Sequence, residues 1–292
     1  MKKKIKLFCF GFGQVGKYFV KNLLKKKIDL ELVTTNTKES RVDQIDELRY
    51  KSFFFSGKKY DPNLLKELKS SSKVLISISP KNQDDLVLKM FKKSFLENKF
   101  DWITYLSATS IYGNKNGNWV DENSTAEPTS SRGIARLNAE NSWLKYYKKF
   151  NLPVQIFRLS GIYSLENNIM KRLKEGTLQV VEKKDHFFSR IHVEDIAEVL
   201  AISLDQFKAG EIFNISDNYP SSNEEIAKYA SELIQIKLPK KIYPDAIDSE
   251  MLKDFYKDSK KVSNKKMKFF FKYSLKYPTF KEGLDMIKNN FF

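Results

Sequence analysis

The sequence has little sulfur and no long apolar run. Cys9 is the single cysteine among 292 residues, so no internal disulfide can form and a reducing compartment is expected. No stretch approaches the ~20 apolar residues that a membrane-spanning helix needs. Lys2, Lys3 and Lys4 before an apolar run mimic a signal peptide, but the run enters Gly11 without a small-residue cleavage site. These absences predict a soluble, cytoplasmic protein.

Arginine is also scarce, although the chain is strongly basic. Lys and Arg number 52 against 36 Asp and Glu, which gives a formal net charge of +16. The lysines are scattered over nearly every segment, and arginine is the better reader of bases. An AT-rich genome explains the abundance of Lys, Asn, Ile and Phe better than nucleic-acid binding does. We predict no specific nucleic-acid partner and no metal site; steering of a phosphate-bearing ligand remains an alternative use of the charge.

Short apolar runs alternate with segments of helical spacing, and hydrophobic residues make up 41% of the chain, enough for a packed core. Strands are expected at 5–10, 30–34, 74–79, 102–107, 154–159 and 211–215, and helices at 17–26, 63–70, 91–98, 131–149, 193–204 and 223–234. This order predicts an α/β fold, a Rossmann-type doubly wound parallel sheet with a small C-terminal substrate lobe. We place the dinucleotide-binding domain at 1–160 and the lobe at 161–292, with 192–216 returning to the sheet.

A glycine-rich turn follows the first expected strand and opens the first helix. It matches G-x-G-x-x-G with Gly11, Phe12, Gly13, Gln14, Val15 and Gly16. In this setting the first glycine permits a tight turn, the second lets a pyrophosphate approach the backbone, and the third lets the helix pack against the strand. The helix N-terminus adds free N–H groups and positive potential. The turn predicts dinucleotide binding; the alternative is a turn that serves packing alone.

The end of the second strand is expected to meet the adenosine ribose. An acidic residue there would favour NAD, and arginine would favour NADP. Thr35 and Asn36 occupy this place and are predicted to hydrogen-bond the ribose, while Lys38 or Arg41 is placed to meet a 2′-phosphate. Either NAD or NADP is therefore expected as cofactor, and the balance favours NADP by a small margin.

Four further motifs carry a family resemblance. They are LSATSIYG at 106–113, PTSSRG at 128–133, RLSGIY at 158–163 and RIHVED at 190–195. With them the chain resembles the extended short-chain dehydrogenases/reductases, the nucleotide-sugar epimerase/dehydratase group, from end to end. Ser263-Asn264 and Tyr277-Pro278 resemble an atypical branch of that group. Its bacterial members are described as NAD(P)-dependent epimerase/dehydratase-like proteins.

The resemblance also shows where the chain departs from the family. The family uses a Ser or Thr together with Tyr-x-x-x-Lys on one helix, where the lysine lowers the tyrosine pKa for proton transfer. Aligned on Pro128 and Glu140, the tyrosine position falls on Arg132 and the lysine position on Arg136. Aligned on Ile111-Tyr112-Gly113, the Ser/Thr position falls on Ala108. Arginine cannot act as a general acid near neutrality. The usual triad is therefore replaced.

Other residues take roles that the resemblance implies. Ser77, Ser79, Ser107, Arg136 and Gly161 are expected to contact the cofactor. Thr109 and Arg132 are expected to bind substrate, Arg132 by clamping a carboxylate or phosphate. For both arginines the alternative is a solvated helix face.

Two residues are candidates for the missing proton transfer. Tyr112 is expected near the cleft, and His192 resembles a position that lines the family's active site. Packing is the alternative for Tyr112, and capping or structural hydrogen bonding is the alternative for His192.

Three functions remain open at this point. The first is an NAD(P)-dependent oxidoreductase or epimerase that acts on a nucleotide sugar or phosphorylated carbonyl compound. The second is a non-catalytic dinucleotide-binding sensor or assembly protein, suggested by the replaced triad. The third, nucleic-acid binding, rests on charge alone. The family resemblance also implies a homodimer through two long helices of the sheet domain, and no membrane partner is expected.

Overall fold

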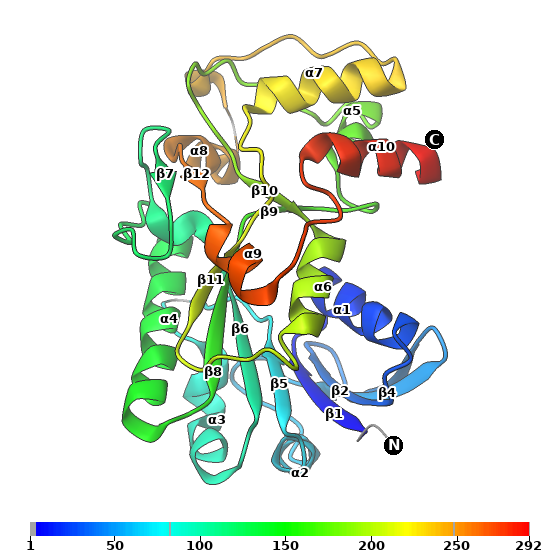
Figure 1. The fold of residues 1–292 in the computed structure, drawn as a ribbon, viewed down its shortest axis with the longest axis vertical. Helices are drawn as coiled ribbons and strands as arrows, with labels where there is room; N and C mark the ends of the chain where they lie inside the picture. The colour runs from blue at the N-terminus through cyan, green and yellow to red at the C-terminus, as the bar shows by residue number, and fades with distance from the viewer. Residues whose placement is uncertain (1–3, 82, 248, 292) are drawn as a thin grey trace. The chain divides into compact units, whose positions relative to one another are not determined.

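A computed structural model describes residues 4–81, 83–247 and 249–291, so Lys2 and Lys3 lie outside the described residues. The chain forms two compact units, each built from separate stretches of sequence (Figure 1). The first contains residues 1–108, 134–158 and 196–212, and the second contains residues 109–133, 159–195 and 213–292. Residues 109–133 are therefore grouped by their contacts with the C-terminal part of the chain.

The first unit is organised around a sheet with β1 near its middle. Within the described residues the sheet has eight strands in the order β11-β8-β6-β5-β1-β2-β4-β3, and from Phe213 on β11 is grouped with the second unit. Their bounds are β1 Ile5–Phe10, β2 Leu30–Asn36, β3 Arg41–Ile45, β4 Leu48–Phe54, β5 Lys73–Ile76, β6 Trp102–Ala108, β8 Val154–Leu159 and β11 Ile212–Ile215. The pairs β1–β2, β1–β5, β2–β4 and β5–β6 run parallel, and β3 runs antiparallel to β4. The predicted Rossmann-type α/β fold is confirmed.

The strands carry apolar side chains on both faces of this sheet, and helices therefore cover both faces. The helices are α1 Gln14–Lys25, α2 Asn63–Lys69, α3 Leu86–Glu97, α4 Ser131–Phe150 and α6 Val193–Ile202. On one face Tyr105 of β6 stacks on Trp143 of α4. On the other face Trp102 stacks on Phe19 of α1 and donates its indole N–H to Ser203 just after α6. The sheet is therefore doubly wound.

The second unit has its own helical core. Its helices are α5 Ile169–Lys174, α7 Asn223–Ile234, α8 Glu250–Lys257, α9 Lys265–Phe271 and α10 Phe280–Phe291. Apolar residues of α5, α7 and α10 form one buried cluster. Helix α7 begins at a capping residue, Ser222, whose hydroxyl accepts a hydrogen bond from the Glu225 N–H. Two small parallel pairs complete the unit: β9 Gly161–Tyr163 with β10 Arg190–His192, and β7 Trp119–Val120 with β12 Lys261–Val262.

Helix α4 has 20 residues, and its exposed positions are mostly polar or charged. Within the three described ranges, no helix is long and apolar enough to cross a bilayer.

Candidate functional site

The glycine turn joins β1 to α1 and leaves an open space at the start of the helix. Gly11 adopts φ +80°, and its N–H donates to the Thr35 hydroxyl at 2.8 Å. A Cβ at Gly11 would also lie 3.0 Å from a side-chain carbon of Ile78, so glycine is required there. Gly13 caps α1 without any side-chain hydrogen bond, and a Cβ built on it meets nothing within 4 Å. The first turn of α1 is thus accessible to an anion.

Arg136 of α4 ties together the carboxyl ends of two neighbouring strands. Its guanidinium donates to the Leu106 carbonyl oxygen of β6 at 2.6 Å and to the Ser79 hydroxyl, which follows β5, at 2.9 Å. Beside Leu106, the Ser107 hydroxyl is buried and has no hydrogen-bond partner among the described residues. Ser77 is partly exposed and donates its N–H to the Phe10 carbonyl. This edge of the sheet therefore offers polar groups to a ligand.

Thr35 and Asn36, the expected ribose ligands, both have partners within the protein. The Thr35 hydroxyl is buried and accepts the bond from Gly11. The Asn36 amide donates to the Ser52 hydroxyl, and its oxygen accepts from the backbone N–H of Lys38 and of Glu39. These contacts favour a structural role for both side chains and build the turn that exposes Lys38.

Tyr112, in a short 3₁₀ helix over Thr109–Tyr112, is completely buried. Its hydroxyl donates to the side-chain oxygen of Asn214 at 2.7 Å. Thr109, at the start of the same turn, is partly exposed. The environment of Tyr112 matches the packing alternative and does not favour a role as a proton donor to substrate.

His192, at the end of β10, is also completely buried. Its Nδ1 accepts a bond from the Glu194 N–H in the first turn of α6, and its ring packs against Tyr163 and Tyr277. Burial lowers the pKa of His192 to about 4, so the ring is neutral at physiological pH. These contacts match the capping alternative.

Arg132 and Gly161 occupy contrasting positions. Arg132 is exposed in the first turn of α4 and has no carboxylate partner among the described residues. A cation at a helix N-terminus is unfavourable for the helix dipole, so a bound anion would relieve the repulsion. Gly161 donates its N–H to the Ser189 carbonyl and lines a cavity of the second unit.

That cavity has a volume of about 560 Å³ and contains two arginines. Arg190 donates to the Ser221 hydroxyl at 2.8 Å and to the Asn223 side chain, and burial lowers the pKa of Arg190 to about 10. Arg172 of α5 lines the same cavity, as does Tyr256 of α8, whose hydroxyl accepts from Asn223. The sequence analysis singled out neither arginine as a candidate ligand, although Arg190 opens one of the family motifs.

The chain is similar in sequence to known enzymes. The "NAD dependent epimerase/dehydratase family" matches residues 87–216. A dTDP-D-glucose 4,6-dehydratase of Dictyostelium discoideum is 23% identical over 266 residues, which cover 76% of this chain and 60% of that protein. The chain therefore spans less than two thirds of the length of this relative.

Two solved structures cover nearly the whole chain. A functionally unknown conserved protein from Silicibacter pomeroyi has a TM-score of 0.87 and 31% identity, covering 98% of this chain and 99% of that one. The UDP-glucuronic acid 4-epimerase of Bacillus cereus, in complex with UDP-glucuronic acid and NAD, has a TM-score of 0.79 and 18% identity, with 98% of both chains covered. The second likeness supports the fold.

Proposed function

Because this chain belongs to the NAD-dependent epimerase/dehydratase family of extended short-chain dehydrogenases/reductases, we propose that it binds NAD or NADP and acts as an oxidoreductase or epimerase. The observation that carries this proposal is the uncapped start of α1 above an open Gly13. Backbone N–H groups and the helix dipole are suited there to a diphosphate.

The residues at the strand ends fit the rest of such a cofactor. The buried, unpartnered Ser107 hydroxyl would accept or donate a hydrogen bond, and Arg136 would hold a ribose or phosphate beside it. When bound, the nicotinamide would supply or accept a hydride. The Leu106 carbonyl and the Ser79 hydroxyl hold the Arg136 guanidinium in place. We propose that Arg136, so held, positions the cofactor in place of the family's lysine.

The choice between NAD and NADP rests in this proposal on the turn after β2. Asn36 shapes this turn with its own hydrogen bonds, and the exposed Lys38 lies on it. A free ammonium at that place would attract a 2′-phosphate. The named epimerase structure holds NAD, so both dinucleotides must be compared.

An anionic, sugar-derived substrate is proposed for the cavity with Arg172 and Arg190. Guanidinium groups recognise phosphate and carboxylate through paired hydrogen bonds. The Dictyostelium relative is named for dTDP-D-glucose, and the Bacillus structure holds UDP-glucuronic acid. We therefore propose a nucleotide sugar or another phosphorylated carbonyl compound as the substrate class.

Calorimetric titration with NAD, NADH, NADP and NADPH tests the cofactor proposal. We expect micromolar affinity for at least one of the four dinucleotides. If none of the four binds to the folded protein, the proposal is wrong. With the best cofactor present, UDP-glucuronic acid and dTDP-glucose are then tested for turnover by absorbance at the nicotinamide band and by chromatography of the sugar nucleotides.

A second function is favoured by the replaced triad, with Ala108, Arg132 and Arg136 at its positions. A chain that binds dinucleotide without turnover would serve as a sensor or assembly protein. Tight cofactor binding with no turnover of any nucleotide sugar would favour this function, whereas hydride transfer to or from a sugar substrate would exclude it.

A further inference from the structure

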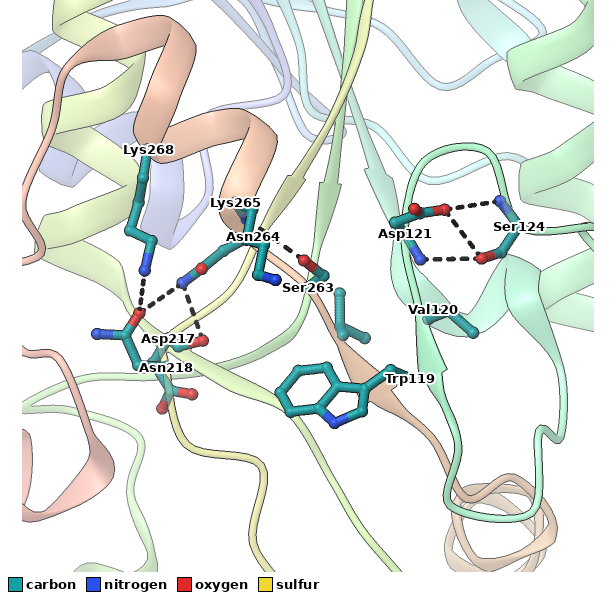
Figure 2. A pocket seen from close by; sticks show the side chains of 11 residues that line it. Trp119, Val120, Asp121, Ser124, Asp217, Asn218, Ser263, Asn264, Lys265 and Lys268 are labelled. Carbon is teal, nitrogen blue, oxygen red and sulfur yellow. Dashed lines mark hydrogen bonds between the residues drawn. The ribbon is translucent and has the colours of Figure 1, made fainter.

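A second cavity of the second unit has a polar, cationic lining around one aromatic ring. Its volume is about 610 Å³, and it lies between the loop that follows β7 and the start of α9. Figure 2 shows the Trp119 indole on one side, with Asn264 and Lys265 across from it and Asp121 to one flank. Gly161, Arg172 and Arg190 do not line this cavity, so it is distinct from the substrate cavity proposed above.

Trp119 differs from the other two tryptophans of the chain. The side chains of Trp102 and Trp143 are completely buried, whereas Trp119 is 58% exposed. Leaving a large indole in water forgoes the stabilisation that its burial would give. An aromatic face turned toward a cavity of this size is a surface on which a flat ring or the C–H face of a sugar can stack.

Positive charge dominates the polar groups around the indole. Lys265 has no ion-pair or hydrogen-bond partner for its ammonium among the described residues. Lys268 donates to the side-chain oxygen of Asn218 and has no carboxylate partner there. Burial raises the pKa of Asp217, another lining residue, to about 8, so Asp217 adds little negative charge at neutral pH. With Asp121 as the other acidic residue of the lining, the two lysines leave the cavity net positive, which suits an anion.

Hydrogen-bonding groups surround the same space. Asp121 uses one carboxylate oxygen for the Asn123 and Ser124 backbone and the Ser124 hydroxyl, which leaves its other oxygen as an acceptor. The Asn264 amide N–H groups bond to Ser216, Asp217 and Asn218 oxygens, so its side-chain oxygen is also an acceptor. Acceptors of this kind bind hydroxyl groups. Trp119 is the single aromatic residue of the lining, so a nucleobase would lack a second stacking partner.

We propose that this cavity binds an anionic monosaccharide, a sugar that carries a carboxylate or a phosphate. Its ring stacks on Trp119, its acidic group lies between Lys265 and Lys268, and its hydroxyls donate to Asp121 and Asn264. The proposal is independent of the cofactor site, because all of these residues belong to the second unit.

Intrinsic fluorescence provides a selective test, since Trp119 is the exposed tryptophan of the three. The 292-residue chain is titrated with D-glucuronate, glucose 6-phosphate, glucose and inorganic phosphate. We expect a saturable change in emission with at least one sugar acid, and binding of neutral glucose at least ~10-fold weaker, about 1.4 kcal/mol. The two acids distinguish a carboxylate from a phosphate as the recognised group.

Variants assign the binding to this cavity, with calorimetry as the readout. Trp119→Ala should abolish binding of the sugar acid, and Lys265→Gln with Lys268→Gln should weaken it at least ~10-fold. Lys288→Gln removes one lysine charge, as each of these two substitutions does, from an exposed position of α10 and should leave binding unchanged. Thermal unfolding checks that each variant is folded, and NAD(P) titration of the same variants reports separately on the proposed function.

Four results would overturn the proposal. The first is that no sugar acid binds the folded protein. The second is that inorganic phosphate binds as tightly as the sugar phosphate, which would indicate an unspecific anion site. The third is that glucose binds as tightly as glucuronate. The fourth is that AMP binds more tightly than either sugar acid and depends on Trp119, which would assign the cavity to a nucleotide.

Discussion

The glycine turn of the first unit and the Tyr112 and His192 region of the second differ in how their polar groups are used. At Gly13 the backbone is open and the helix start has no side-chain cap. Tyr112 and His192 are completely buried, and the Tyr112 hydroxyl and the His192 Nδ1 are bonded to neighbouring residues, although the buried His192 Nε2 has no hydrogen-bond partner among the described residues. Unused polar groups at an accessible helix start can bind a ligand, whereas buried and bonded groups maintain the fold. Similarity to family motifs alone did not separate these two roles.

A substitution at Gly13 tests most directly whether the open glycine turn binds a ligand. We expect Gly13→Asp to weaken NAD(P) binding at least ~100-fold, about 2.7 kcal/mol, because a carboxylate would occupy and repel the phosphate position. Calorimetry measures the affinity. Gly13→Ala is the matched control: Gly13 has φ −82°, and its Cβ would have free space, so this variant should fold normally. Equal dinucleotide affinity of the Asp variant and the wild type would place the cofactor elsewhere.

Arg136 should show the next largest effect. Arg136→Met leaves the Leu106 carbonyl and the Ser79 hydroxyl without their donor. We therefore expect the free energy of unfolding to fall by about 2 kcal/mol. Chemical denaturation measures the loss. We also expect weaker cofactor binding, with a smaller loss of both for Arg136→Lys, which keeps the cation. If the Met variant kept full stability and affinity, Arg136 would be only a solvated helix residue.

Tyr112→Phe tests whether the buried Tyr112 hydroxyl stabilises the fold. Asn214 would lose a buried hydrogen bond, so the free energy of unfolding should fall by about 1 kcal/mol. NAD(P) affinity should stay within about twofold of wild type, because the effect is on folding. A variant of unchanged stability that lost turnover would instead restore Tyr112 as the proton donor.

The smallest effect concerns pH. The pKa of His192 is lowered from 6.5 to about 4 by burial, so between these values the unfolded chain binds more protons than the folded one. This group therefore makes stability fall as pH drops from about 6.5 to about 4. His192→Gln should reduce that loss, measured as unfolding free energy at several pH values. His186 is buried with a similarly lowered pKa, so the loss should not vanish. An unchanged pH profile would mean that His192 is not buried neutral.

Local patterns predicted part of the fold with accuracy. The bounds of β1 and α7 match the expected 5–10 and 223–234, because each has an uninterrupted pattern and a clear turn or cap beside it. The hairpin of β3 and β4 was not predicted. β3 is an edge strand with mostly exposed residues, so its apolar pattern is weak. Asp46, between the two strands, adopts φ +48°, and no local residue pattern predicts this conformation.

The candidate site was predictable where it depends on backbone shape. G-x-G-x-x-G identified the turn because glycine is required by local geometry. Side-chain roles depended on distant partners instead. The Thr35 hydroxyl accepts from Gly11 and the Asn36 amide donates to Ser52, and neither partner could be read from the local sequence; the predicted ribose contact stays a prediction. The paired arginines of the second unit were missed because Arg172 and Arg190 meet at one cavity only in the folded chain.

The two hydrogen bonds of Arg136 also limit which residues can replace it. A planar guanidinium reaches the Leu106 carbonyl and the Ser79 hydroxyl at the same time, which the single ammonium of lysine does less well. Replacement of Arg136 by lysine would thus begin with a loss of stability at this edge of the sheet. The scaffold itself therefore constrains position 136, whatever ligand binds beside it.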